Sequence, residues 1–134
     1  MPELEKPDLY ALADDGRRLQ LIMGYCTQCA KHHFPKTGYG CPNCGAVPEH
    51  VRSELGDGRA TLLTFITLHA KLVPTLEVPS IVGEAQIADG MIEEVMLLGA
   101  AEQYRDGMTL QAVAHEVTRG GRSVLACRFA PAED

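Results

Sequence analysis

The second half of the chain has the alternation of apolar and polar residues, and the turns, of a small β protein. Runs rich in β-branched and aromatic residues predict five strands, at residues 60–69, 80–88, 91–98, 110–117 and 122–129. Asp89-Gly90 and Arg119-Gly120-Gly121 each predict a hairpin. Gly83, inside a strand, is typical of a bulge or a barrel corner. These features predict a small closed barrel, although residues 110–117 would also suit a short helix.

The N-terminal segment has a different pattern, which predicts a short helix. Pro7-Asp8 precedes Leu9, Leu12 and Ala13, and these three apolar residues would share one helical face. Asp8 is the candidate N-cap, and Gly16 would end the helix.

Composition places the chain among globular proteins. Its 134 residues are 46% hydrophobic, which suits one domain with a small appended module. No apolar run approaches the roughly 20 residues of a membrane span. The acidic start lacks the apolar stretch of a signal peptide, so we expect a cytoplasmic protein. The net charge of −6 disfavours binding to duplex nucleic acid.

Charge is unevenly distributed, and the middle of the chain is its most basic part. Residues 17–71 hold seven bases and three acids, a net charge of +4, whereas residues 72–134 carry a net charge of −6. The middle third is therefore the part of the chain best suited to binding an anion, although a solvated basic face explains these bases equally well.

Four cysteines in the glycine- and proline-rich stretch from Gly24 to Pro48 predict a metal site. Cys26-x2-Cys29 and Cys41-x2-Cys44 are two C-x2-C pairs separated by eleven residues. Each pair can aim two thiolates at one point, and two pairs together suit tetrahedral Zn²⁺. Two disulfides and a rubredoxin-like iron site are the alternatives. Four protein ligands leave no open coordination position, so we expect a structural metal that folds a segment without a core of its own.

No catalytic constellation accompanies the cysteine pairs. Cys127 stands alone in a predicted strand, and we interpret it as an inert core thiol rather than a nucleophile. His69 and His115 lack the partner residues of a triad. Glu93 and Glu94, as strand neighbours, would point to opposite faces, which is a poor geometry for paired acid–base chemistry.

The order of these motifs resembles a known family. The resemblance rests on both cysteine pairs, on His33-Phe34-Pro35, on the Gly56–Phe65 segment leading into the first barrel strand, and on Cys127–Pro131. The family joins a rubredoxin-like zinc ribbon to an OB-fold and is encoded beside thiolases and related acyl-CoA enzymes. The expected fold class is therefore mainly β: an N-terminal helical segment at 1–22, a rubredoxin-like zinc ribbon at 23–50 and an OB-fold-like β-barrel at 51–134.

The resemblance implies a non-catalytic subunit of a hetero-oligomer. Such proteins bind thiolase-like, hydroxymethylglutaryl-CoA synthase-like or hydratase-like catalytic subunits, and some help to shape the CoA or acyl-CoA site. One partner type is the benzoylsuccinyl-CoA thiolase of anaerobic toluene breakdown, but Pro79-Ser80 departs from the usual Pro-Tyr and leaves the substrate open. Candidate neighbours of the CoA phosphates are the basic residues of the ribbon, Lys31, His32, His33 and Lys36, with both histidines expected at the surface.

Two other classes of function remain as alternatives. Zinc ribbons and OB-folds also bind single-stranded nucleic acid, but the acidic barrel and the seven aromatic residues disfavour this function. A stand-alone enzyme would have to use Cys127 or a histidine. An apolar partner surface could include Met91, Ile92, Val95, Leu97 and Leu98, which core packing explains equally well.

Overall fold

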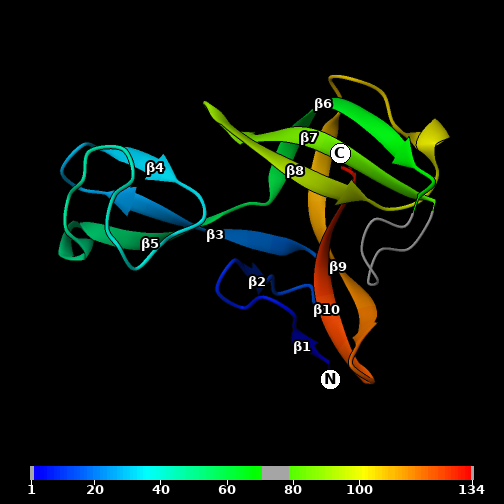
Figure 1. The fold of residues 1–134 in the computed structure, drawn as a ribbon, viewed down its shortest axis with the longest axis horizontal. Coiled ribbons are helices and arrows are strands. Elements are labelled where there is room, and N and C mark those ends of the chain that lie inside the picture. Colours follow the sequence, from blue (N-terminus) through cyan, green and yellow to red (C-terminus); the bar gives the residue numbers. More distant parts are fainter. Residues whose placement is uncertain (1, 71–78, 134) are drawn as a thin grey trace.

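One long strand, β3 (Leu19–Cys26), joins two β lobes in the computed structural model, which describes residues 2–70 and 79–133 (Figure 1). The other strands are β1 (Glu3–Leu4), β2 (Tyr10–Leu12), β4 (Lys31–His33), β5 (Val51–Gly56), β6 (Arg59–Leu68), β7 (Ser80–Ala88), β8 (Met91–Leu97), β9 (Thr109–Arg119) and β10 (Arg122–Pro131). Two 3₁₀ helices, η1 (Pro48–His50) and η2 (Ala101–Gln103), complete the described part, which contains no α-helix. Within it, no helix is long and apolar enough to cross a membrane.

The larger lobe is a barrel of five strands, which closes between β8 and β10 at a single pair of residues. Their order is β6-β7-β8-β10-β9, and β9 returns to pair with β6. All pairs are antiparallel except β8–β10, which is parallel and meets at Leu97 and Phe129. This arrangement is the five-stranded Greek-key barrel of the OB-fold. The predicted barrel is confirmed.

The predicted strands and hairpins agree closely with the observed ones. Gly90, with φ of 74°, lies in the turn between β7 and β8, and Gly120 and Gly121 have positive φ in the turn between β9 and β10. The segment that would also suit a helix is a strand, because β9 pairs with β10 along nearly its whole length. Long-range pairing therefore decides a segment whose local preference is ambiguous.

Gly83 lies beside a bulge in the barrel wall. The register of the β6–β7 pairing shifts between Leu62 and Thr64. The next residue of β6, Phe65, is the partner of Gly83. A Cβ atom on Gly83 would lie 2.8 Å from Cδ1 of Leu62 and 3.1 Å from the carbonyl oxygen of Thr64. Glycine is therefore required here because two strands approach closely where the barrel turns.

The predicted N-terminal helix is wrong. Residues 3–4 form β1, which pairs in parallel with β10, and residues 10–12 form β2, which pairs with β3. The Tyr10 ring is buried, and the N–H of Ile22 donates to the carbonyl oxygen of Leu9. A helix of this length is marginal by itself, so pairing with existing strands and burial of Tyr10 determine the structure. Gly16, with φ of 72°, lies in the turn before β3.

The smaller lobe is a sheet in which β3 is central. β2 and β4 pair with opposite ends of one edge of β3, and β5 pairs with the other edge. The predicted boundary at residues 22 and 23 therefore falls inside β3, and β5, assigned to the barrel segment 51–134, pairs within this sheet. The three-part division of the chain stays a prediction.

Two separate clusters of buried residues stabilise the two lobes. The main core fills the barrel and extends to Tyr10, Leu19, Leu21 and Met23 of β2 and β3. The second cluster contains the buried Cys26, Cys41 and Ala46, with Cys29 and Val51 packed against them. Such a small cluster cannot stabilise the smaller lobe by hydrophobic burial alone, so the cysteines need a further source of stability.

Candidate metal centre

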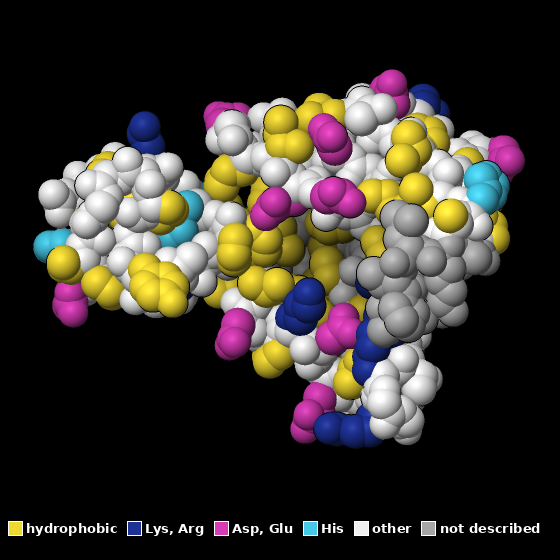
Figure 2. Space-filling view, in the orientation of Figure 1, with side chains coloured by type: hydrophobic (Ala, Val, Ile, Leu, Met, Phe, Trp, Pro, Cys, Tyr) yellow, Lys and Arg dark blue, Asp and Glu magenta, His cyan; other side chains and the backbone are white. Residues whose placement is uncertain are grey.

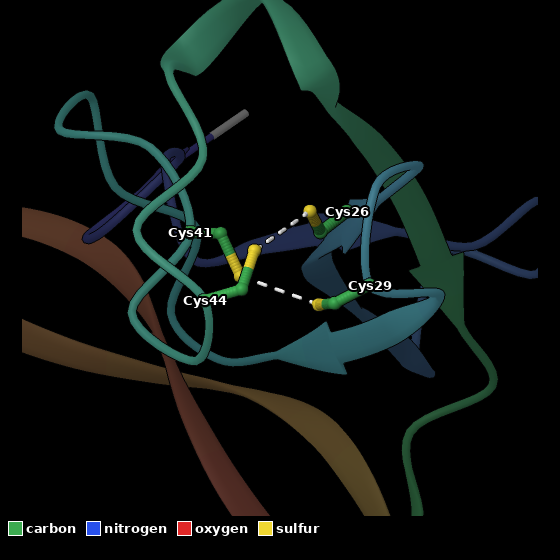
Figure 3. A group of neighbouring side chains, drawn as sticks. All are labelled: Cys26, Cys29, Cys41 and Cys44. Atoms are coloured by element: carbon green, nitrogen blue, oxygen red, sulfur yellow. Dashed lines mark hydrogen bonds between the residues drawn. The ribbon is translucent and has the colours of Figure 1, made fainter.

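The four cysteines of the two C-x2-C pairs converge on one point (Figure 3). Their four Sγ atoms lie within 4.8 Å of one another. The Sγ atoms of Cys26 and Cys44 are 3.7 Å apart, as are those of Cys29 and Cys41. Zn–S bonds of about 2.3 Å in a tetrahedron place the sulfurs about 3.8 Å apart. The four thiolates therefore fit a tetrahedral Zn²⁺ ion.

Each cysteine pair is held in a tight turn by backbone hydrogen bonds. The N–H of Ala30 donates to the carbonyl oxygen of Cys26, and the N–H of Gly45 donates to that of Cys41. Both donors have left-handed backbones, with φ of 59° at Ala30 and 78° at Gly45. Glycine at position 45 adopts this conformation without strain, whereas nothing in the sequence identified Ala30 as its counterpart.

The surroundings of the site oppose ionisation of Cys29 and favour that of Cys41. Burial, and then hydrogen bonds with the neighbouring thiols, raise the pKa of Cys29 to about 12. Burial also opposes ionisation of Cys41, but hydrogen bonds from the backbone N–H groups of Cys44 and Asn43 lower its pKa to about 7. The N–H of Asn43 lies 3.3 Å from the Sγ atom of Cys41. A divalent cation would offset the effect of burial that opposes ionisation of Cys29.

These distances bear on the alternatives to zinc. The sulfur separations of 3.7 Å for the Cys26–Cys44 and Cys29–Cys41 pairs are far longer than the roughly 2.05 Å of a disulfide bond, and all five cysteines are free thiols. A tetrathiolate site also accepts iron, which shares this geometry. Because all four positions around the ion are filled by protein ligands, the metal has a structural role.

The basic residues of the ribbon divide into exposed and buried groups. Lys31, His32 and Lys36 are exposed, and neither lysine forms an ion pair within the described residues. His33, expected at the surface, is only 5% exposed. Its ring packs directly against Gly24, where a Cβ atom would lie 2.3 Å from Nε2. His33 is buried because the opposing strand position has no side chain. Lys71, counted with the middle third, lies outside the described residues.

His32 belongs to a polar cluster on the outer face of the ribbon. Its Nε2 atom lies 2.6 Å from Oε1 of Glu54, and its ring packs against Tyr25 with centroids 4.7 Å apart. The guanidinium of Arg52 lies over the Tyr25 ring and also contacts Glu54. Hydrogen bonds from His32 and then Arg52 lower the pKa of Glu54. His32 is therefore already engaged, which leaves Lys31 and Lys36 as the accessible bases.

The remaining candidates do not assemble into a catalytic site. Burial raises the pKa of Cys127 to about 11, as suits an inert thiol. His69 is exposed just after β6, whereas His115 lies in β9 opposite Ala126. Glu93 is half-buried and Glu94 is exposed, in line with strand neighbours that face opposite sides. Nothing in the sequence indicated that Cys127, Glu93 and Glu94 line one cavity with Phe34 of the ribbon.

Comparisons with known proteins agree with this architecture. Residues 13–47, less than half of the chain, match the family described as ChsH2, rubredoxin-like zinc ribbon domain. No curated protein matches the chain. Among solved structures, a chain described as "Ltp2-ChsH2(DUF35) aldolase" is 21% identical with a TM-score of 0.60, and the match covers 84% of each chain. At this identity the match shows a shared fold.

Proposed function

We propose that this chain, a ChsH2-like zinc ribbon joined to a five-stranded barrel, is a non-catalytic accessory subunit of an enzyme complex that acts on acyl-CoA thioesters. The observation that carries the proposal is the closed tetracysteine site of the ribbon joined to a barrel without a catalytic constellation among the described residues. A metal with four protein ligands has no position for substrate, so chemistry would come from a partner.

The partner we propose is a thiolase-like catalytic subunit. Thiolases and aldolases both break a carbon–carbon bond next to a carbonyl group, and the structural neighbour is described as an aldolase. A benzoylsuccinyl-CoA thiolase, as in toluene breakdown, is one specific form of this proposal. An aldolase-type subunit is the second candidate, favoured by the description of that neighbour.

Within such a complex, we propose that Lys31 and Lys36 lie near the phosphates of CoA. Both are exposed on the ribbon and lack an acidic partner within the described residues. His32 would contribute less because it contacts Glu54, and the buried His33 is unsuited to direct contact. A Lys31→Ala, Lys36→Ala double variant should raise the KM for acyl-CoA several-fold with kcat little changed. Arg105→Ala, at an exposed base on the barrel, is the matched control.

The first experiment is affinity purification of the tagged chain from its source cell, with mass spectrometry of the proteins retained. Expected is a thiolase-like or aldolase-like chain that cleaves acyl-CoA in the complex and loses activity without this subunit. Thiolysis with free CoA distinguishes the two classes, because an aldolase needs no thiol acceptor. Recovery of single-stranded nucleic acid, or turnover by the isolated chain, would contradict the accessory role.

A further inference from the structure

The barrel is split along one side, between β8 and β10. These strands pair at Leu97 and Phe129, and the N–H of Leu98 donates to the carbonyl oxygen of Phe129 at 2.9 Å. On this side of β8, no strand in residues 2–70 or 79–133 pairs with the preceding residues of the strand. On the opposite wall, β1 pairs with β10 at Val124 and Leu125. Figure 1 shows β8 diverging from β10 above β3.

The unpaired edge of β8 presents backbone hydrogen-bonding groups to the split. The N–H and C=O groups of successive residues in a strand point to opposite edges. Residues 94 and 96 therefore direct these groups to the same edge as Leu98. That side faces away from β7. The N–H and C=O of Glu94 therefore point into the split, where no strand among the described residues pairs with them. Such an edge is a template for another strand.

An apolar cavity of about 310 Å³ lies beside this edge. β8 forms one wall and β10 the other, whereas Leu9, Tyr10, Leu21 and Phe34 contribute apolar side chains from the N-terminal segment and the ribbon. Figure 2 shows this apolar hollow in the middle of the molecule, below acidic side chains. The volume is at the lower end of ligand sites and suits apolar side chains of an inserted segment.

The charge of the β8 wall favours a basic partner. The β7–β8 hairpin, residues 80–97, contains Glu84, Asp89, Glu93 and Glu94 and no lysine or arginine. None of these acids enters an ion pair within the described residues. Glu84 and Glu94 are direct cross-strand partners, an arrangement of like charges that a cation would relieve. Lys6 and Arg128 also line this cavity, but they belong to the N-terminal segment and to β10. The negative charge is therefore concentrated along β8.

We propose that the free edge of β8 receives an extended segment of the catalytic partner, which adds a strand to the barrel, inserts apolar side chains into the cavity and places a lysine or arginine beside Glu94. The inference rests on the proposed accessory function, because it assigns that partner its binding surface. The acidic wall opposes binding of nucleic acid or an anionic membrane here.

Hydrogen exchange of the purified complex tests the inference without a variant. Strand addition should slow exchange of the Glu94 amide about ten-fold or more relative to the free chain, because that N–H would gain a carbonyl partner. The turn at Gly120-Gly121, at the far end of the β9–β10 hairpin, should be unchanged and serves as the control.

Two substitutions at Glu94 separate the backbone contribution from the charge. Glu94→Pro removes the N–H at the free edge and leaves the β7–β8 hydrogen bonds in place, a position at which strands tolerate proline. Glu94→Gln keeps the N–H and removes the charge. We expect Glu94→Pro to weaken binding of the co-purified partner about ten-fold or more and Glu94→Gln by less. Circular dichroism and zinc content should match those of the original chain.

The possible results distinguish the two proposals. A bound partner with an unprotected Glu94 amide and full affinity for Glu94→Pro would overturn strand addition and leave the accessory role standing. Failure of the original chain to retain any catalytic subunit would contradict the accessory role, and the binding surface with it. If the free chain dimerises and Glu94→Pro abolishes the dimer, the edge belongs to an interface with a second copy. That result would overturn the inference.

Discussion

At the scale of single residues, two positions in the ribbon reduce the free energy of unfolding. His33 is buried with neither ring nitrogen hydrogen-bonded, and Ala30 has a left-handed backbone with φ of 59°. A buried polar group without a partner costs about 1–3 kcal/mol, and a left-handed non-glycine residue about 1–2 kcal/mol. Both residues lie close to the first cysteine pair, so their effects should be measurable in the stability of the metal-loaded chain.

Replacing His33 with phenylalanine should stabilise the protein, and more so in mild acid. Burial, then the nearby charges of His32 and Lys36, lower the pKa of His33 below its usual 6.5. The unfolded chain therefore takes up the proton first, and stability falls as the pH drops below 6.5. His33→Phe keeps a ring beside Gly24 and removes this proton uptake.

The measurement is the melting temperature of both proteins at pH 7.5 and pH 6.0 with excess zinc. We expect the advantage of His33→Phe to widen at the lower pH. Protonation of the cysteine ligands affects both proteins alike and cancels in the difference. An advantage that is equal at the two pH values would contradict the assigned role of His33.

Gly45→Ala should weaken zinc binding through backbone strain alone. Gly45 has φ of 78°, and a Cβ atom there would meet nothing within 4 Å. A cost of about 1 kcal/mol corresponds to about a five-fold loss of affinity, measurable by competition with a chelator. Ala30→Gly, at the equivalent position of the first turn, relieves the same strain and should not weaken binding. Equal losses for the two variants would contradict this explanation.

At the scale of elements, the two lobes have different sources of stability. The barrel has an extended core that includes Leu62, Leu110 and Phe129, whereas the apolar cluster of the ribbon has three buried members, of which two are cysteines. β3 links them because its first half packs in the main core and its last residue, Cys26, belongs to the metal site. Metal binding therefore substitutes for a hydrophobic core in the ribbon.

Removal of the metal should unfold the ribbon and leave the barrel folded. With a strong chelator, amides of residues 24–56 should exchange rapidly, whereas β6, β7, β9 and β10 keep their protection because their core lacks metal ligands. Cys44→Ser should have the same effect without a chelator. Hydrogen exchange by peptide mass spectrometry measures both regions at once. Loss of protection in the barrel together with the ribbon would show that the two lobes unfold as one unit.

At the scale of the whole molecule, closure of the barrel depends on the short junction between β8 and β10. Tyr104, which is buried just after η2, donates a hydrogen bond from its hydroxyl group to the carbonyl oxygen of Leu98. Its Oη atom also lies 3.3 Å from the carbonyl oxygen of Phe129. Burial raises the pKa of Tyr104. This side chain thus links Leu98, directly after β8, to Phe129 of β10 at the point where the split begins.

Tyr104→Phe should destabilise the chain by about 1–2 kcal/mol, because the carbonyl oxygen of Leu98 loses a buried hydrogen bond. Urea unfolding measures the loss, and faster exchange of the Leu98 amide would locate it at the junction. Tyr39→Phe, at a residue that is 97% exposed, is the control. An unchanged Leu98 amide in Tyr104→Phe would show that the junction closes without the hydroxyl.

The sequence by itself determined the parts whose interactions are local. The C-x2-C spacing forms turns within a few residues, and Asp89-Gly90 positions two strands that are adjacent in the chain. The four metal ligands, the five barrel strands and both hairpins were therefore predictable. So was the resemblance to a ribbon–barrel protein, because it depends on the order of these local motifs.

The tertiary structure decided everything that depends on distant partners. Leu9, Leu12 and Ala13 fit a helix locally, but β3 and β10 offer edges that pair with this segment and bury Tyr10. His33 is buried because a glycine lies opposite it, on another strand. The free edge of β8 also arises only when the barrel closes at Leu97 and Phe129. Local spacing cannot encode these features, because each depends on which remote strand comes to lie beside the residue.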